Sequence, residues 1–172
     1  GSISPSGDEN LAVFSSIIHL GSNPALIGFI LRPKTVPRNS HANMKSTGVF
    51  TLNAISSNQI EDAHHTSAKY PDNISEFDQT NLEPEIKQGW KAPYVKGAQI
   101  QIGCSYVNEY LIKENDTVLV VGKIEHLFIE EQLLGKDGWI QLDKGDIVSI
   151  NGLDGYAIPT LIKRFEYARP KK

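Results

Sequence analysis

The chain has 172 residues, which is enough for one domain with a hydrophobic core of its own. Hydrophobic residues make up 40% of it and charged residues 22%, as in ordinary globular proteins, and its net charge is −3. This balance argues against nucleic acid or an anionic membrane as its general partner, and no apolar run approaches the ~20 residues of a transmembrane helix. The chain opens without a signal peptide, and its one cysteine, Cys104, cannot form an internal disulfide. We therefore expect a cytoplasmic protein.

The first part of the chain predicts a hairpin and a buried strand. Residues 1–4 and 10–18 are strand-like and flank PSGDE, a turn-rich stretch, so they predict two paired strands. Residues 25–31, ALIGFIL, form a short bounded apolar run, which is typical of a buried strand.

Short helices are predicted in the next part of the chain. The first runs from Ser40 to Thr47 and ends at Gly48, and a strand over residues 49–55 follows it. Residues 60–70 also have helical character, and residues 74–82 predict a further short helix.

The second half of the chain is dominated by alternating patterns. Residues 98–112 and 116–129 alternate apolar and polar side chains, and KEND between them predicts a hairpin turn. Cys104 follows two isoleucines at period two, so a packed strand residue is favoured over a catalytic thiol. Residues 146–150 predict a last short strand. Strands dominate, so the sequence indicates a single mostly β domain over residues 1–172, built as a closed or partly closed barrel.

A basic loop leads into the first predicted helix. Arg32, Lys34 and Arg38 lie in this loop, and Asn39 and Ser40 are both residue types that favour the N-cap position. The start of a helix offers unpaired N–H groups and a partial positive charge, which together suit a phosphate.

Three side chains around this helix start add donors for an anion. Arg38 supplies a planar, permanent cation, Ser40 a hydroxyl, and Asn43 lies one turn further on the same helix. The alternative is an ordinary capped helix with solvated basic residues, because Arg-x-Ser before a helix is not a specific motif.

Two stretches, NLAVFSSIIHLGSNPALIGFILRP and RNSHANMKSTGVFTLN, together resemble the flavin reductase-like family. The family pattern is roughly Asn-Leu-Ala-Pro-Phe-Ser, Ser-Asn-Pro-Pro-Leu, an Arg, a Lys/Arg-Asp-Thr triplet, an Asn and Gly-x-Phe-x-x-Asn. The resemblance continues through KAPYV and DGYA and so covers most of the chain. The matching elements here are Asn10–Ser15, Ser22–Leu26, Arg32, Arg38–Ser40, Asn43, Gly48–Asn53, residues 91–95 and residues 154–157.

The resemblance implies a split β-barrel that binds FMN. It implies that Arg38, Ser40 and the helix start hold the FMN phosphate, while Arg32 either joins this phosphate site or pairs with an acid. The ribityl chain and the polar edge of the ring would be lined by Asn10, Leu11, Ala12, Ser15 and Ser16. The expected cofactor-binding residues are Asn10, Leu11, Ala12, Ser15, Ser16, Arg32, Arg38, Asn39, Ser40 and Asn43.

The chain also departs from the family pattern. Val13 stands where the family has proline and Asn39 where it has aspartate, and neither change removes a phosphate donor. The stretch that the family usually carries before GSIS is not in this sequence, so we expect that an N-terminal segment is missing.

Other constellations point less clearly to chemistry. His64 and His65 are adjacent, so on a helix they point about 100° apart, and no zinc-ligand spacing exists; we expect no metal. They are either polar helix residues or residues that lie over the flavin and help to position a nicotinamide or substrate. No Gly-x-Gly-x-x-Gly follows a strand, so a Rossmann nicotinamide site is not indicated.

The resemblance favours an FMN-dependent oxidoreductase, a flavin reductase that transfers hydride from NAD(P)H to flavin. It also implies a homodimer with the flavin near the subunit interface. The alternatives are a non-catalytic FMN-binding or electron-carrier module and a pyridoxamine-phosphate oxidase-like enzyme of the same fold. The sequence indicates no essential acid–base residue, and it does not distinguish NADH from NADPH.

Overall fold

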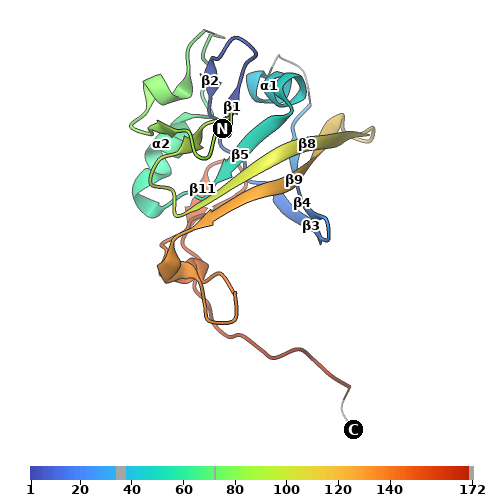
Figure 1. Ribbon diagram of the computed structural model, residues 1–172, viewed down its shortest axis with the longest axis vertical. Coiled ribbons are helices and arrows are strands. Elements are labelled where there is room, and N and C mark those ends of the chain that lie inside the picture. Colours follow the sequence, from blue (N-terminus) through green and yellow to red (C-terminus); the bar gives the residue numbers. More distant parts are fainter. Residues whose placement is uncertain (34–37, 72, 171–172) are drawn as a thin grey trace.

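The computed structural model describes residues 1–33, 38–71 and 73–170, so Lys34 of the predicted basic loop lies outside the described residues. A five-stranded antiparallel sheet forms its centre, with the strand order β3-β4-β9-β8-β5 (Figure 1). The strands are β3 (Ile17–Ser22), β4 (Ala25–Leu31), β5 (Val49–Asn53), β8 (Ile100–Ile112) and β9 (Thr117–Ile129).

The two long strands β8 and β9 pair along their whole length and form the backbone of this sheet. The turn between them is the KEND segment, so the hairpin predicted from the alternating pattern is confirmed. Their pairing register shifts twice, between Gly103 and Cys104 and between Tyr106 and Asn108. Such β-bulges increase the local twist and bend a sheet, which helps it to curve into a barrel.

The main core lies on one face of the sheet. Phe29 of β4, Phe50 of β5 and Val120 of β9 contribute to it, together with Met44 from the helix that covers this face. Cys104 is fully buried here, and burial raises the pKa of its thiol to about 12. The prediction of a packed strand cysteine is therefore confirmed.

Helix α1 (Asn39–Thr47) links β4 to β5. It ends as predicted at Gly48, whose φ of 75° is left-handed and costs glycine little, and whose N–H donates to the Met44 carbonyl. The N-cap residue is Arg38, not Asn39 or Ser40 as the sequence suggested.

The N-terminal hairpin is shorter than predicted. Strands β1 (Ser2–Ile3) and β2 (Glu9–Asn10) pair antiparallel around the PSGDE turn, but β2 ends where Leu11 begins. The reason is a distant contact, because the Leu11 N–H donates to the Glu76 carboxylate at 2.9 Å rather than to a strand. Of the remainder of the predicted strand, residues 11–16 belong to no strand, and only Ile17 and Ile18 fall in β3.

The other elements surround the sheet. Residues 60–70 form only one short helix, α2 (Ile60–His65), preceded by the 3-10 turn η1 (Ser57–Gln59). The helix predicted over residues 74–82 is the 3-10 turn η2 (Glu76–Gln79). The predicted last strand is β10 (Ser149–Asn151), and its partner β11 (Gly155–Ala157) was not predicted. The remaining elements are β6 (Pro84–Glu85), β7 (Tyr94–Val95), η3 (Glu131–Leu133) and η4 (Leu142–Lys144).

Within the described residues, no helix is long and apolar enough to cross a membrane.

Candidate functional site

A pocket opens between the segment that follows β2, strand β5 and helix α2. Its cavity volume is about 120 Å³, and it opens to solvent. Its wall is largely apolar, with Leu11, Phe14 and Leu52 among the lining side chains. A few polar groups enter this wall, namely Ser2, Asn10, Ser40, Thr51, Asn53, Gln59 and Thr66. An apolar slot with few polar groups suits a flat aromatic ligand that carries a polar edge.

Helix α1 begins at the rim of this pocket. The Ser40 hydroxyl accepts a hydrogen bond of 2.8 Å from the Asn10 side-chain amide, so it joins the helix start to the pocket wall. The N–H groups of His41 and Ala42 both donate to the Arg38 carbonyl. The N–H groups of Asn39 and Ser40 lie too early in the helix to have an acceptor within it. The helix start therefore presents two backbone donors beside the pocket rim.

Arg38 immediately precedes these donors. Its Nε is buried, and among the described residues it has no hydrogen-bond partner. A buried donor without an acceptor costs free energy, and a guanidinium is permanently charged. An anionic ligand with several oxygens would satisfy it, so the residues present at the helix start fit a phosphate group.

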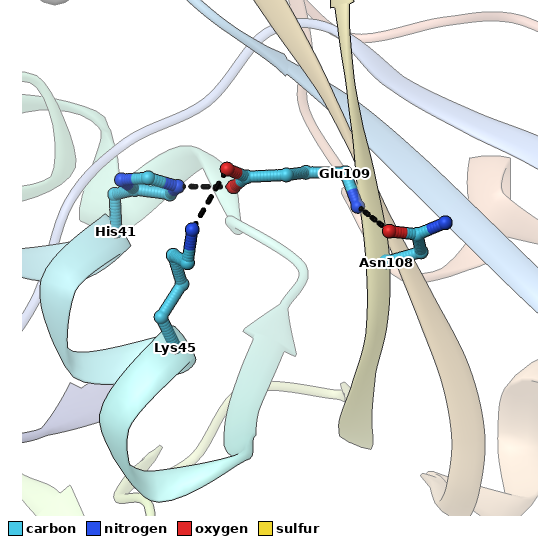
Figure 2. Close-up of polar contacts among 4 residues, drawn as sticks. All are labelled: His41, Lys45, Asn108 and Glu109. Carbon is cyan, nitrogen blue, oxygen red and sulfur yellow. Dashed lines mark hydrogen bonds and ion pairs between the residues drawn. The ribbon is translucent and has the colours of Figure 1, made fainter.

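The helix is tied to the central sheet by a carboxylate clamp of three residues, His41, Lys45 and Glu109 (Figure 2). The Glu109 carboxylate on β8 lies 2.5 Å from His41 Nε2 and 2.9 Å from Lys45 Nζ. His41 and Lys45 are one turn apart on α1, so both side chains reach the same carboxylate. The Glu109 N–H also donates to the side-chain oxygen of Asn108 at 2.8 Å.

The contacts of the clamp strongly favour the charged form of the Glu109 carboxylate. Partial burial disfavours the charged form of the Glu109 carboxylate, but hydrogen bonds from His41, Lys45 and Tyr106 outweigh it and lower the pKa to about 2. The side chain of Glu109 is only 21% exposed, so solvent screens these contacts incompletely. The clamp fixes the rotation of α1, and with it the direction of the donors at its start.

The structure brings together some of the predicted site residues. Asn10, Leu11, Ala12 and Ser40 line the pocket, and partly buried Arg38 and Asn39 stand at the start of α1 next to Ser40.

Four other predicted residues lie outside the pocket wall. The Ser16 hydroxyl is engaged with both backbone groups of Ile30, while Ser15 and Arg32 are exposed. Asn43 is buried and donates from its side chain to the Ser2 hydroxyl at 3.3 Å, so it connects α1 to β1.

Sequence reasoning missed the residues that hold the pocket in shape. Glu76 anchors Leu11, and burial raises the pKa of its carboxylate. Asn53 accepts from the Val95 N–H at 3.0 Å, and Thr51 donates to the Pro93 carbonyl at 2.6 Å. Only Asn53 had a local signal, as the last residue of the Gly-x-Phe-x-x-Asn element.

The two adjacent histidines lie at the end of α2 and are exposed. His64 Nδ1 contacts the Tyr156 hydroxyl at 3.0 Å, and His65 contacts the hydroxyl of Tyr70. Ala63 and Thr66 of the same segment line the pocket instead. Across the described residues, no group of three or more His, Cys, Asp or Glu side chains is placed to hold a metal ion.

The fold and the pocket together define a mostly β split-barrel protein with a helix start at the rim of its pocket. Residues 1–142 match the family model described as "Flavin reductase like domain". The chain belongs to this flavin reductase-like family.

Solved structures agree with this assignment. The chain is 37% identical to a putative flavin reductase with a split barrel domain from Shewanella frigidimarina NCIMB 400, with a TM-score of 0.93 over 98% of this chain and 83% of that one. Nitrilotriacetate monooxygenase component B from Bacillus cereus is 24% identical, with a TM-score of 0.84 over 96% and 83% of the two chains. An FMN-binding protein from Thermus thermophilus is 18% identical, with a TM-score of 0.74 over 91% and 82%. The last two likenesses show the fold alone.

Proposed function

We propose that this chain binds FMN and acts as a flavin reductase, in which NAD(P)H donates hydride to the flavin. The observation that carries the proposal is the buried Arg38 Nε at the start of α1, which lacks a hydrogen-bond partner among the described residues. A terminal phosphate dianion supplies the acceptors that this arrangement lacks. The adjoining apolar pocket then has the right character for the isoalloxazine ring.

The proposed flavin site uses the two ends of the pocket differently. Arg38, Asn39 and Ser40 would hold the phosphate, with Arg32 close to them in the chain. The segment Asn10–Ala12 would face the ribityl chain and the polar ring edge, with Ser15 and Ser16 further along it. Asn43 would support the site indirectly, because its hydrogen bond to Ser2 holds α1 against β1.

Bound FMN supplies the redox chemistry, since its ring accepts a hydride and passes electrons on. The side chains of this protein bind it, orient it and exclude water from one part of it. Leu11, Phe14 and Leu52 provide apolar cover, and Asn10 is held toward the helix start by its bond to Ser40. We assign no side chain as a proton donor or acceptor in this reaction.

We further propose that the protein is a cytoplasmic homodimer of one split-barrel domain, with the flavin near the subunit interface. The support is the family assignment and the general prevalence of closed two-fold dimers. The family likeness also supports an oxidoreductase over a protein that only carries flavin.

The first experiment is the absorbance spectrum of the purified protein, followed by mass analysis of any released chromophore. We expect FMN, or uptake of added FMN with higher affinity than FAD. A colourless protein that does not bind added FMN would overturn the proposal.

Anaerobic titration with NADH and with NADPH then separates the two classes of function. A reductase bleaches the flavin absorbance stoichiometrically with one or both nucleotides. A carrier module, the alternative, stays oxidised with both and is reduced only by a partner protein or dithionite.

A further inference from the structure

Residues 158–170 form an arm that follows β11 and leaves the body of the protein. Every residue of this arm is exposed, and none belongs to a helix or a strand. Figure 1 shows the arm running away from the five-stranded sheet and from α1, toward the C-terminal end of the described chain.

The arm carries an unusual amount of exposed apolar surface. Ile162 is 95% exposed, Phe165 75% and Tyr167 91%, and Ile158 and Leu161 are exposed as well. Exposed apolar side chains that are concentrated in this way mark an interaction surface. The composition of the arm is thus that of a segment that packs against something.

The contacts that attach the arm to its own copy are weak. Arg164 Nη2 lies 2.6 Å from the Asp137 carboxylate, and its guanidinium lies 4.4 Å from the centre of the Trp139 ring. Both partners of the ion pair are about half exposed, at 49% and 56%, so solvent screens their attraction. One such anchor does not offset the conformational entropy lost by ordering the whole arm. A second surface is needed to hold it.

The charge of the arm indicates what that surface is. Residues 158–170 contain three basic residues and one acid, a net charge of +2, and two lysines follow them in the sequence. Since the whole chain carries −3, residues 1–157 carry −7. The basic arm therefore complements the acidic body of another copy. An anionic lipid surface would attract the arm but repel the body.

We propose that residues 158–170 are an exchange arm, which packs its apolar side chains onto the body of a second copy of this chain. In a two-fold dimer the exchange is reciprocal, so each copy donates one arm and receives one. The contacts of Arg164 with Asp137 and Trp139 hold the middle of the arm to its own copy. This inference does not depend on flavin binding.

The test combines an interchain crosslink with a dissociation constant. A photo-crosslinking phenylalanine analogue replaces Phe165 in the full chain, and sedimentation velocity over a dilution series gives the dimer dissociation constant. The disrupting variant is Ile162→Ser, Phe165→Ser and Tyr167→Ser combined. The matched control is Leu153→Ser, because Leu153 is also highly exposed, at 67%, but lies between β10 and β11.

We expect an interchain crosslink on illumination, and a dissociation constant raised more than about tenfold by the triple variant but not by Leu153→Ser. Circular dichroism checks that the triple variant is folded, which we expect because all three residues are exposed. A monomeric wild-type chain, an intrachain crosslink only, or an unchanged dissociation constant in the triple variant each overturns the proposal. Arm-dependent pelleting of a monomer with phosphatidylserine vesicles would likewise overturn it and assign the arm to membranes.

Discussion

Helix α1 and the arm over residues 158–170 both lie outside the central sheet, but they are attached to it very differently. Met44 inserts α1 into the main core, and His41 and Lys45 of α1 both contact the largely buried Glu109 carboxylate on β8. Among the described residues, the arm makes one exposed ion pair, and its apolar side chains lie in solvent. The difference suggests that α1 is held by its own chain to present a ligand site, whereas the arm is completed by another chain.

The largest expected effect comes from removing the apolar attachment of α1. Met44 is 2% exposed and packs with Phe29 and Phe50, so Met44→Ala leaves a cavity and should lower the free energy of unfolding by about 2–5 kcal/mol. Chemical denaturation measures this loss. The matched comparison is Ile162→Ala in the arm, which should change the unfolding of the isolated monomer very little. Equal effects of the two changes would contradict the distinction between the regions.

The contacts of Glu109 with α1 should make the free energy of unfolding depend on pH. The pKa of Glu109 is about 2 in the folded protein and near 4.5 in its ordinary range, so its contribution is full above pH 4.5 and lost as the pH falls toward 2. Glu109→Gln should therefore lower the free energy of unfolding at pH 7 by up to about 3 kcal/mol. The stabilities of variant and wild type should converge on acidification.

The control for this prediction is Glu125→Gln on the neighbouring strand. Glu125 contacts Ser105 and Lys123, but it lies at the surface and its pair with Lys123 is exposed to solvent. We expect Glu125→Gln to change the free energy of unfolding at pH 7 less than Glu109→Gln does. A Glu109→Gln variant with wild-type stability at pH 7 would show that the clamp does not hold α1.

A smaller effect is expected from the contact between the helix start and the pocket wall. Ser40→Ala removes the hydroxyl that accepts from the Asn10 amide, so Asn10 loses its orientation toward the helix. We expect FMN affinity to fall severalfold, about 0.5–1.5 kcal/mol, as for the loss of one neutral hydrogen bond. Flavin fluorescence titration measures the change. An unaltered affinity would place the flavin away from Ser40.

Elements set by local sequence patterns could be predicted from the sequence, whereas contacts between residues far apart in the chain could not. Strand β4, the hairpin of β8 and β9, and the end of α1 at Gly48 follow from local patterns of apolar residues and from one glycine. The bond of Glu76 to Leu11 and the clamp of Glu109 on His41 join residues 65 and 68 positions apart, and no local pattern announces them. These distant contacts shorten β2 and set the direction of α1.

The position of the candidate site could also be predicted from local sequence elements. The order of the Asn10–Ser15, Arg38–Ser40 and Gly48–Asn53 elements carried the family resemblance, and the structure puts parts of all three around one pocket. Residue-level roles were harder to predict, because burial decides them. Asn43 turns inward to Ser2 and Ser16 to the backbone of Ile30, which helical or strand spacing alone does not show.

The most direct test of the central claim compares FMN with riboflavin, which lacks the phosphate, in wild type and in Arg38→Ala. The variant loses a charge-assisted contact of about 1.5–3 kcal/mol, so FMN affinity should fall about 10- to 150-fold while riboflavin affinity hardly changes. Arg169→Ala, which removes the same charge from the exposed arm, should leave both affinities unaltered. Equal losses for FMN and riboflavin in Arg38→Ala, or no loss for either, would contradict a phosphate site at the start of α1.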